Sequence, residues 1–516
     1  MYVEHPLIRP GTVLERDYQR NLAEACVRSS TLLVLPTGLG KTVVALRVAA
    51  EVLESKGGKA LFLAPTKPLV VQLASYLREH LAGRTVDLVT GENPPRDRVA
   101  IWQGSDVIVA TPQTVANDLR RGELDLAPVS LIVFDEAHRA VGNYAYVEVA
   151  KRYQGLVLGL TASPGATRKR IAALCRNLGV EALEWREEGD DDVAPYVHGV
   201  DIEWREVDPP AHMGEVVEQL RELHRTSLDQ LVGMRLVKAD RPATVPYLLQ
   251  VNRSIQARMG RGNRGYLFRA LSAVAAAIKV AHALELAETQ STAALARYLD
   301  KLRREAASKG GSRASKNIAS SPQLARVTAL LEEAGEHPKM RQVERLVAEQ
   351  LASRPTSRVM VFTNYRDSCD AVVTALGTID GVRVSRLVGQ APRFGDAGQR
   401  QGEQVGVLSK LRNGQINVVV ATCIGEEGLD VADTDLVIFY EPVPSEIRSI
   451  QRRGRTGRSG PGRVVVLVTR GTRDVTSLQA SVRKEGTMHR QLARLKAKKE
   501  LLAGPADQEE GVASPA

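Results

Sequence analysis

The stretch from Leu33 to Thr42 constrains the fold more than any other part of this sequence. It reads Leu-Val-Leu-Pro-Thr-Gly-Leu-Gly-Lys-Thr, an apolar run that ends in a glycine-rich turn and is followed by apolar residues at helical spacing. That order predicts a buried strand, a tight turn and the N-terminus of a helix. Such a turn directs backbone N–H groups and the positive end of the helix dipole at an anion. The stretch therefore predicts an α/β domain with a phosphate-binding site.

The turn has the residue types that nucleotide binding requires. Gly38 and Gly40 let the backbone approach a ligand closely, and Lys41 would reach the outer phosphates. The Thr42 hydroxyl would hold Mg²⁺. We expect the following residues of the turn to bind ATP: Pro36, Thr37, Gly38, Leu39, Gly40, Lys41 and Thr42.

Two residues upstream of the turn are candidates for contact with the base. A glutamine amide can pair with the edge of an adenine, which suits Gln19. Arg16 lies three residues before it. We expect both to contribute to ATP binding, the alternative being an ordinary helical glutamine.

Strands and helices alternate through the first part of the chain, which predicts a first domain over residues 1–205. The apolar runs that predict its strands are Ala60–Ala64, Asp106–Ala110, Leu131–Phe134 and Leu156–Leu160. Continuous apolar strands separated by helices indicate a parallel sheet covered on both faces. Ligands of such sheets bind beyond the carboxyl ends of the strands.

An acidic pair follows one of these strands directly. Asp135 suits Mg²⁺ binding through water, and Glu136 suits the catalytic base that activates the attacking water. His138 could couple this pair to the next strand end, where Thr161 and Ser163 lie. The alternative is an acidic surface turn.

Other strand ends in the first half carry hydroxyls, glycine or lysine, which fit contacts to a phosphodiester backbone without base reading. The nucleic-acid-binding candidates there are Thr66, Lys67, Gly91, Thr111 and Gln113.

The excess of positive charge is concentrated in the middle of the chain. Arg241–Lys316 contains fourteen lysines and arginines against four acidic residues, while the whole chain carries a net charge of +10. Helical periodicity replaces strand alternation here, with one long helical stretch over Tyr266–Lys301. We predict an all-helical insertion over residues 206–337 that grips a polyanion by its backbone. Its candidate contacts are Arg261, Arg264, Arg303 and Arg304.

The sequence also indicates where the protein works. Its four cysteines, Cys26, Cys175, Cys369 and Cys423, lie far apart, which argues against a disulfide framework or a metal cluster. No signal-peptide core is present at the N-terminus, and no apolar run is expected to approach a membrane span. We expect an intracellular protein without a membrane partner.

A second strand–helix alternation predicts a second domain over residues 338–480, followed by a C-terminal helix and disordered tail over 481–516. It has no lysine-bearing phosphate loop, so we expect it to close over the first domain. Arg455 and Arg458 are candidate arginine fingers, with Gln451 near the phosphate or water. The alternative is a basic patch for nucleic acid. The stretch Thr422–Asp430 could contact nucleic acid through Thr422 and nucleotide through Gly428 and Asp430.

Together these motifs resemble a superfamily 2 helicase with a DEAH box, Asp135-Glu136-Ala137-His138. Longer matches are similar to the helicase part of archaeal Hef, a relative of the FANCM DNA translocases. These matches are Leu63–Leu69, Phe134–Tyr146 and Tyr440–Arg458. The resemblance implies two RecA-like domains with a DNA-gripping helical insertion, fuelled by ATP and Mg²⁺.

The resemblance also implies nucleic-acid contacts by Thr363, Gly389 and Gln390, and action on forks and four-way junctions in DNA repair or replication restart. Hef carries a nuclease, but no nuclease motif occurs here, so a separate nuclease or sliding clamp would be the partner. We expect a cytoplasmic, nucleoid-associated protein whose motor is monomeric.

Two alternatives remain open. Dicer and the innate RNA sensors share this motor and its inserted helices, so an RNA-directed helicase or double-stranded-RNA-stimulated ATPase fits the same composition. A non-catalytic nucleic-acid clamp would predict a broken ATP site, yet Lys41, Glu136 and Arg455 are all present.

Overall fold

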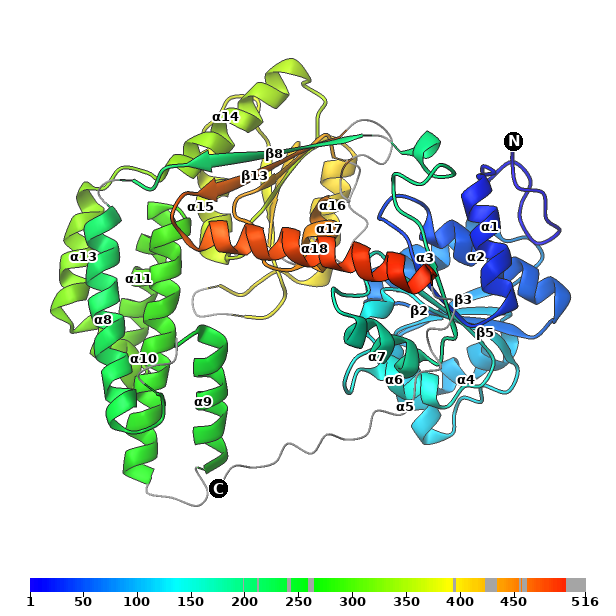
Figure 1. The fold of residues 1–516 in the computed structure, drawn as a ribbon, viewed down its shortest axis with the longest axis horizontal. Helices are drawn as coiled ribbons and strands as arrows, with labels where there is room; N and C mark the ends of the chain where they lie inside the picture. Colours follow the sequence, from blue (N-terminus) through cyan, green and yellow to red (C-terminus); the bar gives the residue numbers. More distant parts are fainter. Residues whose placement is uncertain are drawn as a thin grey trace.

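The computed structural model describes residues 1–197, 199–210, 213–238, 243–258, 264–392, 396–422, 434–453, 456 and 462–497. Within these residues the chain forms two lobes, each built on a parallel sheet, and a bundle of helices (Figure 1). The predicted fold class is confirmed: two RecA-like α/β domains with an all-helical insertion between them.

The first lobe contains a seven-stranded sheet with the order β3-β4-β2-β5-β6-β1-β7. Its strands are β1 (Thr31–Val34), β2 (Lys59–Leu63), β3 (Val86–Val89), β4 (Val107–Ala110), β5 (Val129–Phe134), β6 (Leu156–Thr161) and β7 (Ala182–Trp185). Its helices are α1 (Asp17–Arg28), α2 (Lys41–Ser55), α3 (Lys67–His80), α4 (Pro95–Gly104), α5 (Pro112–Arg121), α6 (Ala145–Lys151) and α7 (Arg168–Leu178). Helices α1–α3 and α5–α7 bury opposite faces of the sheet in two apolar clusters, which explains why the central strands are apolar throughout.

The described part of the helical insertion consists of helices that share two apolar cores. They are α8 (Met213–Gly233), α9 (Val245–Arg258), α10 (Arg264–Thr289), α11 (Thr292–Ala307), α12 (Arg313–Ala319) and α13 (Pro322–Glu333). The stretch expected as one helix over 266–301 is two helices. The break lies at Ser291, whose hydroxyl accepts a hydrogen bond from the Ala294 N–H at 2.9 Å and so caps α11.

The expectation that no apolar run approaches a membrane span is wrong for helix α10. By length and composition alone, the 25-residue stretch Gly265–Thr289 could cross a membrane, since it contains an 18-residue window with a mean hydropathy of 1.5. Core helices satisfy the same test. In this structure α10 contributes Val274 and Ala277 to a core shared with α9, and Val280 and Leu284 to one shared with α8.

The second lobe contains a six-stranded parallel sheet with the order β10-β11-β9-β12-β13-β8. Its strands are β8 (Val200–Val207), β9 (Val359–Phe362), β10 (Val384–Leu387), β11 (Val418–Ala421), β12 (Leu436–Phe439) and β13 (Gly462–Thr469). Its helices are α14 (Pro338–Ser353), α15 (Arg366–Leu376), α16 (Gln401–Arg412), α17 (Glu446–Arg453) and α18 (Arg473–Ala497).

Strand β8 precedes the insertion in sequence but pairs with β13 along its whole length. The expected first-domain boundary at residue 205 therefore falls inside a strand of the second sheet. The sequence Val-Asp-Ile-Glu-Trp-Arg-Glu-Val is half polar, unlike a central parallel strand. Its place at the edge of the sheet explains this composition, because one side of an edge strand stays near solvent.

Helix α18 follows β13 and crosses from the second lobe to the first (Figure 1). Its residues Met488, Leu492 and Leu495 are buried in the same apolar cluster as first-lobe residues such as Trp185. The two lobes are thus joined by the chain entering β8 and by the apolar face of α18.

Candidate functional site

The glycine-rich turn connects β1 to the N-terminus of α2. Gly38 and Gly40 have φ angles of +88° and +76°, which L side chains rarely adopt. A Cβ atom added to Gly40 would lie 2.4 Å from Gln19 Nε2, so the position has no room for a side chain. Helix α2 starts at Lys41, which places its first backbone N–H groups at the turn and creates an anion site.

Gln19 and Tyr18 of α1 hold the turn through hydrogen bonds to Leu39 O. The buried Gln19 amide donates to Leu39 O and to the Tyr18 hydroxyl, both at 3.2 Å, and that hydroxyl donates to Leu39 O at 2.9 Å. Arg16 donates to the Tyr18 hydroxyl at 3.3 Å and its guanidinium lies 5.2 Å from the Tyr196 ring centroid. The structure therefore brings Arg16 and Gln19 to the turn. Tyr18 was missed, although its spacing from Leu22 and Cys26 marks it as an inward-facing residue.

Lys41 and the acidic pair lie at the carboxyl ends of strands in the same sheet. The Lys41 ammonium donates to Leu35 O at 3.0 Å and to Pro36 O at 3.3 Å. Burial and the neighbouring Glu136 charge raise the pKa of Asp135 to about 7, while the Lys41 charge opposes that rise. A nearby cation would favour the ionised form of Asp135, which is the form that binds a metal.

The backbone around the acidic pair is tightly held. Glu136 has a φ of +48°, an uncommon and strained conformation for a residue with a side chain. Its N–H donates to Asp135 Oδ1 at 2.9 Å. The buried Tyr146 hydroxyl donates to Asp135 O at 2.6 Å and to Leu63 O at 3.0 Å. Tyr146 fixes the strand ends that carry the pair, a role that its place in the sequence does not reveal.

The three expected coupling residues are in contact. His138 Nδ1 lies 3.2 Å from Thr161 Oγ1 and 3.3 Å from Glu136 Oε2. The Thr161 hydroxyl donates to Ser163 O at 3.1 Å. Ser163 Oγ in turn donates to Met488 Sδ at 3.0 Å, so the chain of contacts continues into α18.

A cavity of about 300 Å³ lies between the two lobes. On the first lobe it is lined by residues of the turn, from Pro36 to Leu39, and by Trp185. On the second lobe it is lined by Ile450 and Arg453 near the end of α17, and by Met488 of α18. Lys41 and Asp135 are not among its lining residues. The cavity therefore lies next to the glycine-rich turn, which we call the phosphate turn, and not over the acidic pair.

Several predicted second-lobe residues lie outside the described part of the chain. They are Gly428, Asp430, Arg455 and Arg458; of Gln451 only the backbone, in α17, is described. Arg453 precedes the expected arginine fingers and pairs with Glu485 of α18 at 2.5 Å. The buried Arg452 donates to Asn364 Oδ1 at 2.9 Å. These contacts anchor α17 opposite the phosphate turn.

The residues present fit Mg²⁺ with a nucleoside triphosphate. Thr42 offers a hydroxyl in the first turn of α2, and Asp135 offers a carboxylate at the end of β5. Oxygen donors of this kind are those that Mg²⁺ prefers, and the lysine and backbone N–H groups suit phosphate oxygens.

The first-lobe nucleic-acid candidates follow three strands that are neighbours in the sheet, β3, β4 and β2. Thr66 and Lys67 begin α3, and Lys67 pairs with Glu92. Gly91 lies beside Thr114, whose hydroxyl is 2.8 Å from that of Thr111. Gln113 is exposed at the start of α5. The structure thus places these candidates along one edge of the sheet.

The second-lobe candidates follow β9, β10 and β11, which are also neighbours. Gly389 and the exposed Gln390 follow β10. Thr363 and Thr422 are buried, with exposed fractions of 0% and 5%, and the Thr363 hydroxyl donates to Tyr365 O at 3.1 Å. In this structure both side chains are therefore turned away from solvent, which the sequence did not reveal.

The basic residues of the insertion are spread over several helices. Arg303 donates to the Thr328 hydroxyl and Arg304 pairs with Asp300, both on the exposed surface of α11. Arg264 begins α10, but its side chain is outside the description, and Arg261 lies outside the described residues.

Three family models match successive parts of the chain. They are described as DEAD/DEAH box helicase over residues 16–171, a helical bundle of a putative ATP-dependent RNA helicase over 212–337, and helicase conserved C-terminal domain over 338–460.

Among solved structures, the helicase domain of Hef from Pyrococcus furiosus is 44% identical, with a TM-score of 0.67. That match covers 92% of this chain and 100% of the Hef chain. A putative ATP-dependent RNA helicase of Methanocaldococcus jannaschii is 34% identical over 95% of this chain and 62% of its own length. The ATP-dependent DNA helicase mph1 of Neurospora crassa is 33% identical over 88% of this chain and 41% of its own length. The chain thus spans less than two thirds of these curated relatives.

Proposed function

The chain belongs to the Hef and FANCM family of superfamily 2 DEAH-box helicases, and from that premise we propose that it is an ATP-driven motor that remodels branched DNA. The observation that carries the proposal is the cavity between the lobes. Residues of the phosphate turn line one side of it and residues of α17 line the other. A nucleotide bound beside the turn would contact both lobes, so that its binding and hydrolysis would change their relative position, as a motor requires.

The first lobe would bind and orient the nucleotide. Lys41 and the first N–H groups of α2 would hold the outer phosphates, and Thr42 and Asp135 would hold Mg²⁺. The metal, when bound, would neutralise charge on the phosphate oxygens. Glu136 would accept a proton from the attacking water, and its strained backbone fits such a fixed task.

The second lobe would complete the site on closure. Arg455 and Arg458 would offset negative charge on the phosphate that is transferred, with Gln451 nearby. Gly428 and Asp430 would contact the nucleotide. His138, Thr161 and Ser163 would link the acidic pair to α18 through the contacts described above.

DNA would be held by its backbone rather than read by its bases. Candidate contacts follow neighbouring strands in both lobes, and exposed basic residues lie on the insertion, as in Arg303 of α11. The names of mph1 and of its relatives in Neosartorya fischeri and Aspergillus fumigatus support DNA as the substrate. Forks and four-way junctions are the proposed forms, and a separate nuclease or sliding clamp the proposed partner of a monomeric, nucleoid-associated motor in the cytoplasm.

An RNA-directed motor is the second candidate. The relative from Methanocaldococcus jannaschii and the family model of the insertion are both named for RNA helicases. Because contacts to the phosphate backbone do not by themselves separate DNA from RNA, the substrate has to be measured.

The test compares ATPase stimulation and strand displacement on a DNA fork, a four-way junction, a blunt DNA duplex and double-stranded RNA. We expect the fork and junction to stimulate turnover most, and the Lys41→Ala variant to bind DNA without hydrolysing ATP. Stimulation by RNA alone would overturn the choice of DNA. Hydrolysis that no nucleic acid stimulates would overturn the motor.

A further inference from the structure

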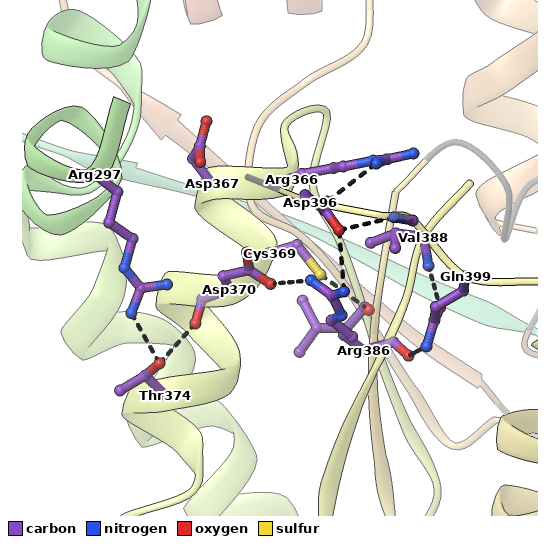
Figure 2. A network of polar contacts seen from close by, with 12 residues as sticks. Arg297, Arg366, Asp367, Cys369, Asp370, Thr374, Arg386, Val388, Asp396 and Gln399 are labelled. Carbon is purple, nitrogen blue, oxygen red and sulfur yellow. Dashed lines mark hydrogen bonds and ion pairs between the residues drawn. The ribbon is translucent and has the colours of Figure 1, made fainter. Parts of the chain in front are cut away.

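The loop between β10 and α16 is held at its base by one buried guanidinium group. Arg366, the first residue of α15, donates through one nitrogen to Gly389 O at 2.6 Å and to Ala391 O at 2.8 Å. Its other nitrogen donates to Asp396 Oδ2 at 3.0 Å. The Arg366 and Asp396 side chains are only 7% and 6% exposed. A single side chain thus binds both arms of the loop. Figure 2 shows its contact with Asp396.

Asp396 gathers further donors from the returning arm and from the sheet. Its Oδ1 accepts from the Gly398 N–H at 2.9 Å and from Arg386 at 3.2 Å. Arg386 also donates to Asp370 of α15 at 2.9 Å. Although burial acts against its ionised form, the Gly398 N–H and the guanidinium groups of Arg366 and Arg386 keep the pKa of Asp396 below its ordinary value.

The two arms of the loop also contact each other directly. The Gln399 N–H donates to Gly389 O at 3.3 Å, and the Gln399 side chain accepts from the Val388 N–H at 2.7 Å. Gly398 has a φ of +72°, and a Cβ added there would lie 2.6 Å from Gly389 O. The described parts of the two arms are therefore hydrogen-bonded to each other as well as to Arg366.

Buried charge pairs of this kind are an inefficient way to increase the stability of a surface loop. Charges removed from water lose hydration, and well-packed apolar residues in their place are often neutral or stabilising. What a forked guanidinium with three hydrogen bonds supplies is a defined geometry. The network therefore indicates that its role is to fix the position of Gly389 and Gln390 rather than to stabilise the lobe.

Helix α15 also holds the insertion. Asp367, next to Arg366, pairs with Lys301 of α11, and Arg297 of α11 donates to Thr374 at 3.0 Å. Lys301, Arg366, Asp367 and Asp396 all line one cavity of about 250 Å³. The exposed Arg303 and Arg304 lie on α11 just beyond. Helix α15 thus contacts the loop through Arg366 and α11 through Asp367 and Thr374.

We propose that Arg366 and Asp396 are positioning residues that hold the loop after β10 so that Gly389 and Gln390 meet the backbone of the nucleic acid gripped by α11. This inference rests on the proposed function, because it needs a nucleic-acid substrate. Arg366 and Asp396 act through the loop and do not themselves contact the substrate.

The experiment measures equilibrium binding of a fluorescent DNA fork without nucleotide, and the ATPase rate as the fork is titrated. Asp396→Asn keeps the shape and the acceptor for Gly398 but removes the charge that faces two arginines. We expect its dissociation constant and its KM for the fork to rise about ten-fold, as loss of one or two backbone contacts would cause, with kcat at saturating fork within about two-fold of wild type. Arg366→Lys, which keeps the charge but lacks the fork of donors, should show a smaller rise.

Arg345→Gln is the matched control, because it removes an arginine–carboxylate pair with Glu349 on the exposed surface of the same lobe. It should leave both constants unchanged. Equal binding by wild type, Asp396→Asn and Arg366→Lys would overturn the inference, as would a fall in kcat without a change in KM. If Asp396→Asn does not fold, Arg366→Lys decides. Wild-type protein that binds the fork but hydrolyses ATP at the same rate without it would instead overturn the proposed motor.

Discussion

We expect removal of the Lys41 side chain to separate ATP hydrolysis from nucleic-acid binding. Its ammonium lies at the phosphate turn, bonded to Leu35 O and Pro36 O, while the exposed basic residues of the insertion lie on other helices. We expect Lys41→Ala to lower ATP turnover by about a hundred-fold or more and to leave the affinity for DNA within about three-fold. Turnover and fork binding measured on the same preparation check this. A variant that still hydrolyses ATP would contradict the assignment of the site.

Glu441 gives the second lobe a pH-dependent stability. Burial raises the pKa of Glu441 from 4.5 to about 7, against the opposing charges of Lys339 and Arg452. Because the folded protein holds this proton more tightly than the unfolded chain, the contribution to stability is full below pH 4.5 and is lost as pH rises through 7. The shift corresponds to about 3 kcal/mol.

Glu441→Gln should remove that dependence. Relative to the variant, the wild type should lose about 2.5 kcal/mol of unfolding free energy between pH 5 and pH 8. Urea unfolding of both proteins at the two pH values measures the difference. Parallel curves at both pH values would show that Glu441 does not carry the effect.

At single residues, the sequence predicts what is contiguous and misses what the fold brings together. The turn from Pro36 to Thr42 and the pair at Asp135 are local patterns with a chemical reason, so they could be named in advance. Tyr146 and Arg366 act through carbonyl groups that are remote in sequence, such as Leu63 O and Gly389 O. No local spacing signals contacts of that kind.

Among the helices, α11 offers the clearest test of backbone recognition. Arg303 and Arg304 are exposed there, and each neutralised phosphate releases counterions. We expect Arg303→Gln with Arg304→Gln to weaken binding of forks and plain duplexes alike, and to reduce the slope of log affinity against log salt by about one to two. Arg326→Gln, on the exposed face of α13 of the same insertion, is the control. An unchanged slope would exclude α11 from the interface.

Helix α18 should stabilise the first lobe although it follows the second in sequence. Leu492 is fully buried in the first-lobe cluster, whereas Val482 on the same helix is 51% exposed. Leu492→Ala should lower the unfolding free energy of the first lobe by about 2–5 kcal/mol, and Val482→Ala by about 0.5 kcal/mol or less. Chemical denaturation, with hydrogen exchange of the β7 amides as the probe of the first lobe, distinguishes the two variants. Equal effects would mean that α18 does not stabilise this lobe.

Elements were predicted well where burial gives them a continuous apolar run. The runs over β2, β4, β5 and β6 identify central strands to within about two residues. The edge strands have no such run, because Glu184 interrupts β7 and β8 is half polar, and their pairing is decided by distant partners. The break between α10 and α11 was missed because Ser291 acts as a cap in a sequence that is otherwise helical throughout.

At the scale of the molecule, the two lobes meet across a cavity of about 300 Å³ and are joined by α18. A nucleotide that draws both lobes to itself should close them. We expect a non-hydrolysable ATP analogue with Mg²⁺ to reduce the radius of gyration in small-angle X-ray scattering, and Lys41→Ala to reduce or abolish that change. An identical radius with and without the analogue would contradict a shared nucleotide.

The two-lobed architecture followed from the two alternations of strands and helices, but the assignment of β8 did not. β8 leaves the ribosome well before β13, its only partner in the described sheet, because about half of the chain lies between them. Nascent chains therefore carry β8 as an unpaired strand until β13 has been synthesised. A fragment that begins at residue 338 would lack β8, so that the Gly462–Thr469 strand would be an exposed edge prone to self-association. Addition of a peptide with the sequence of residues 200–207 should reduce that association.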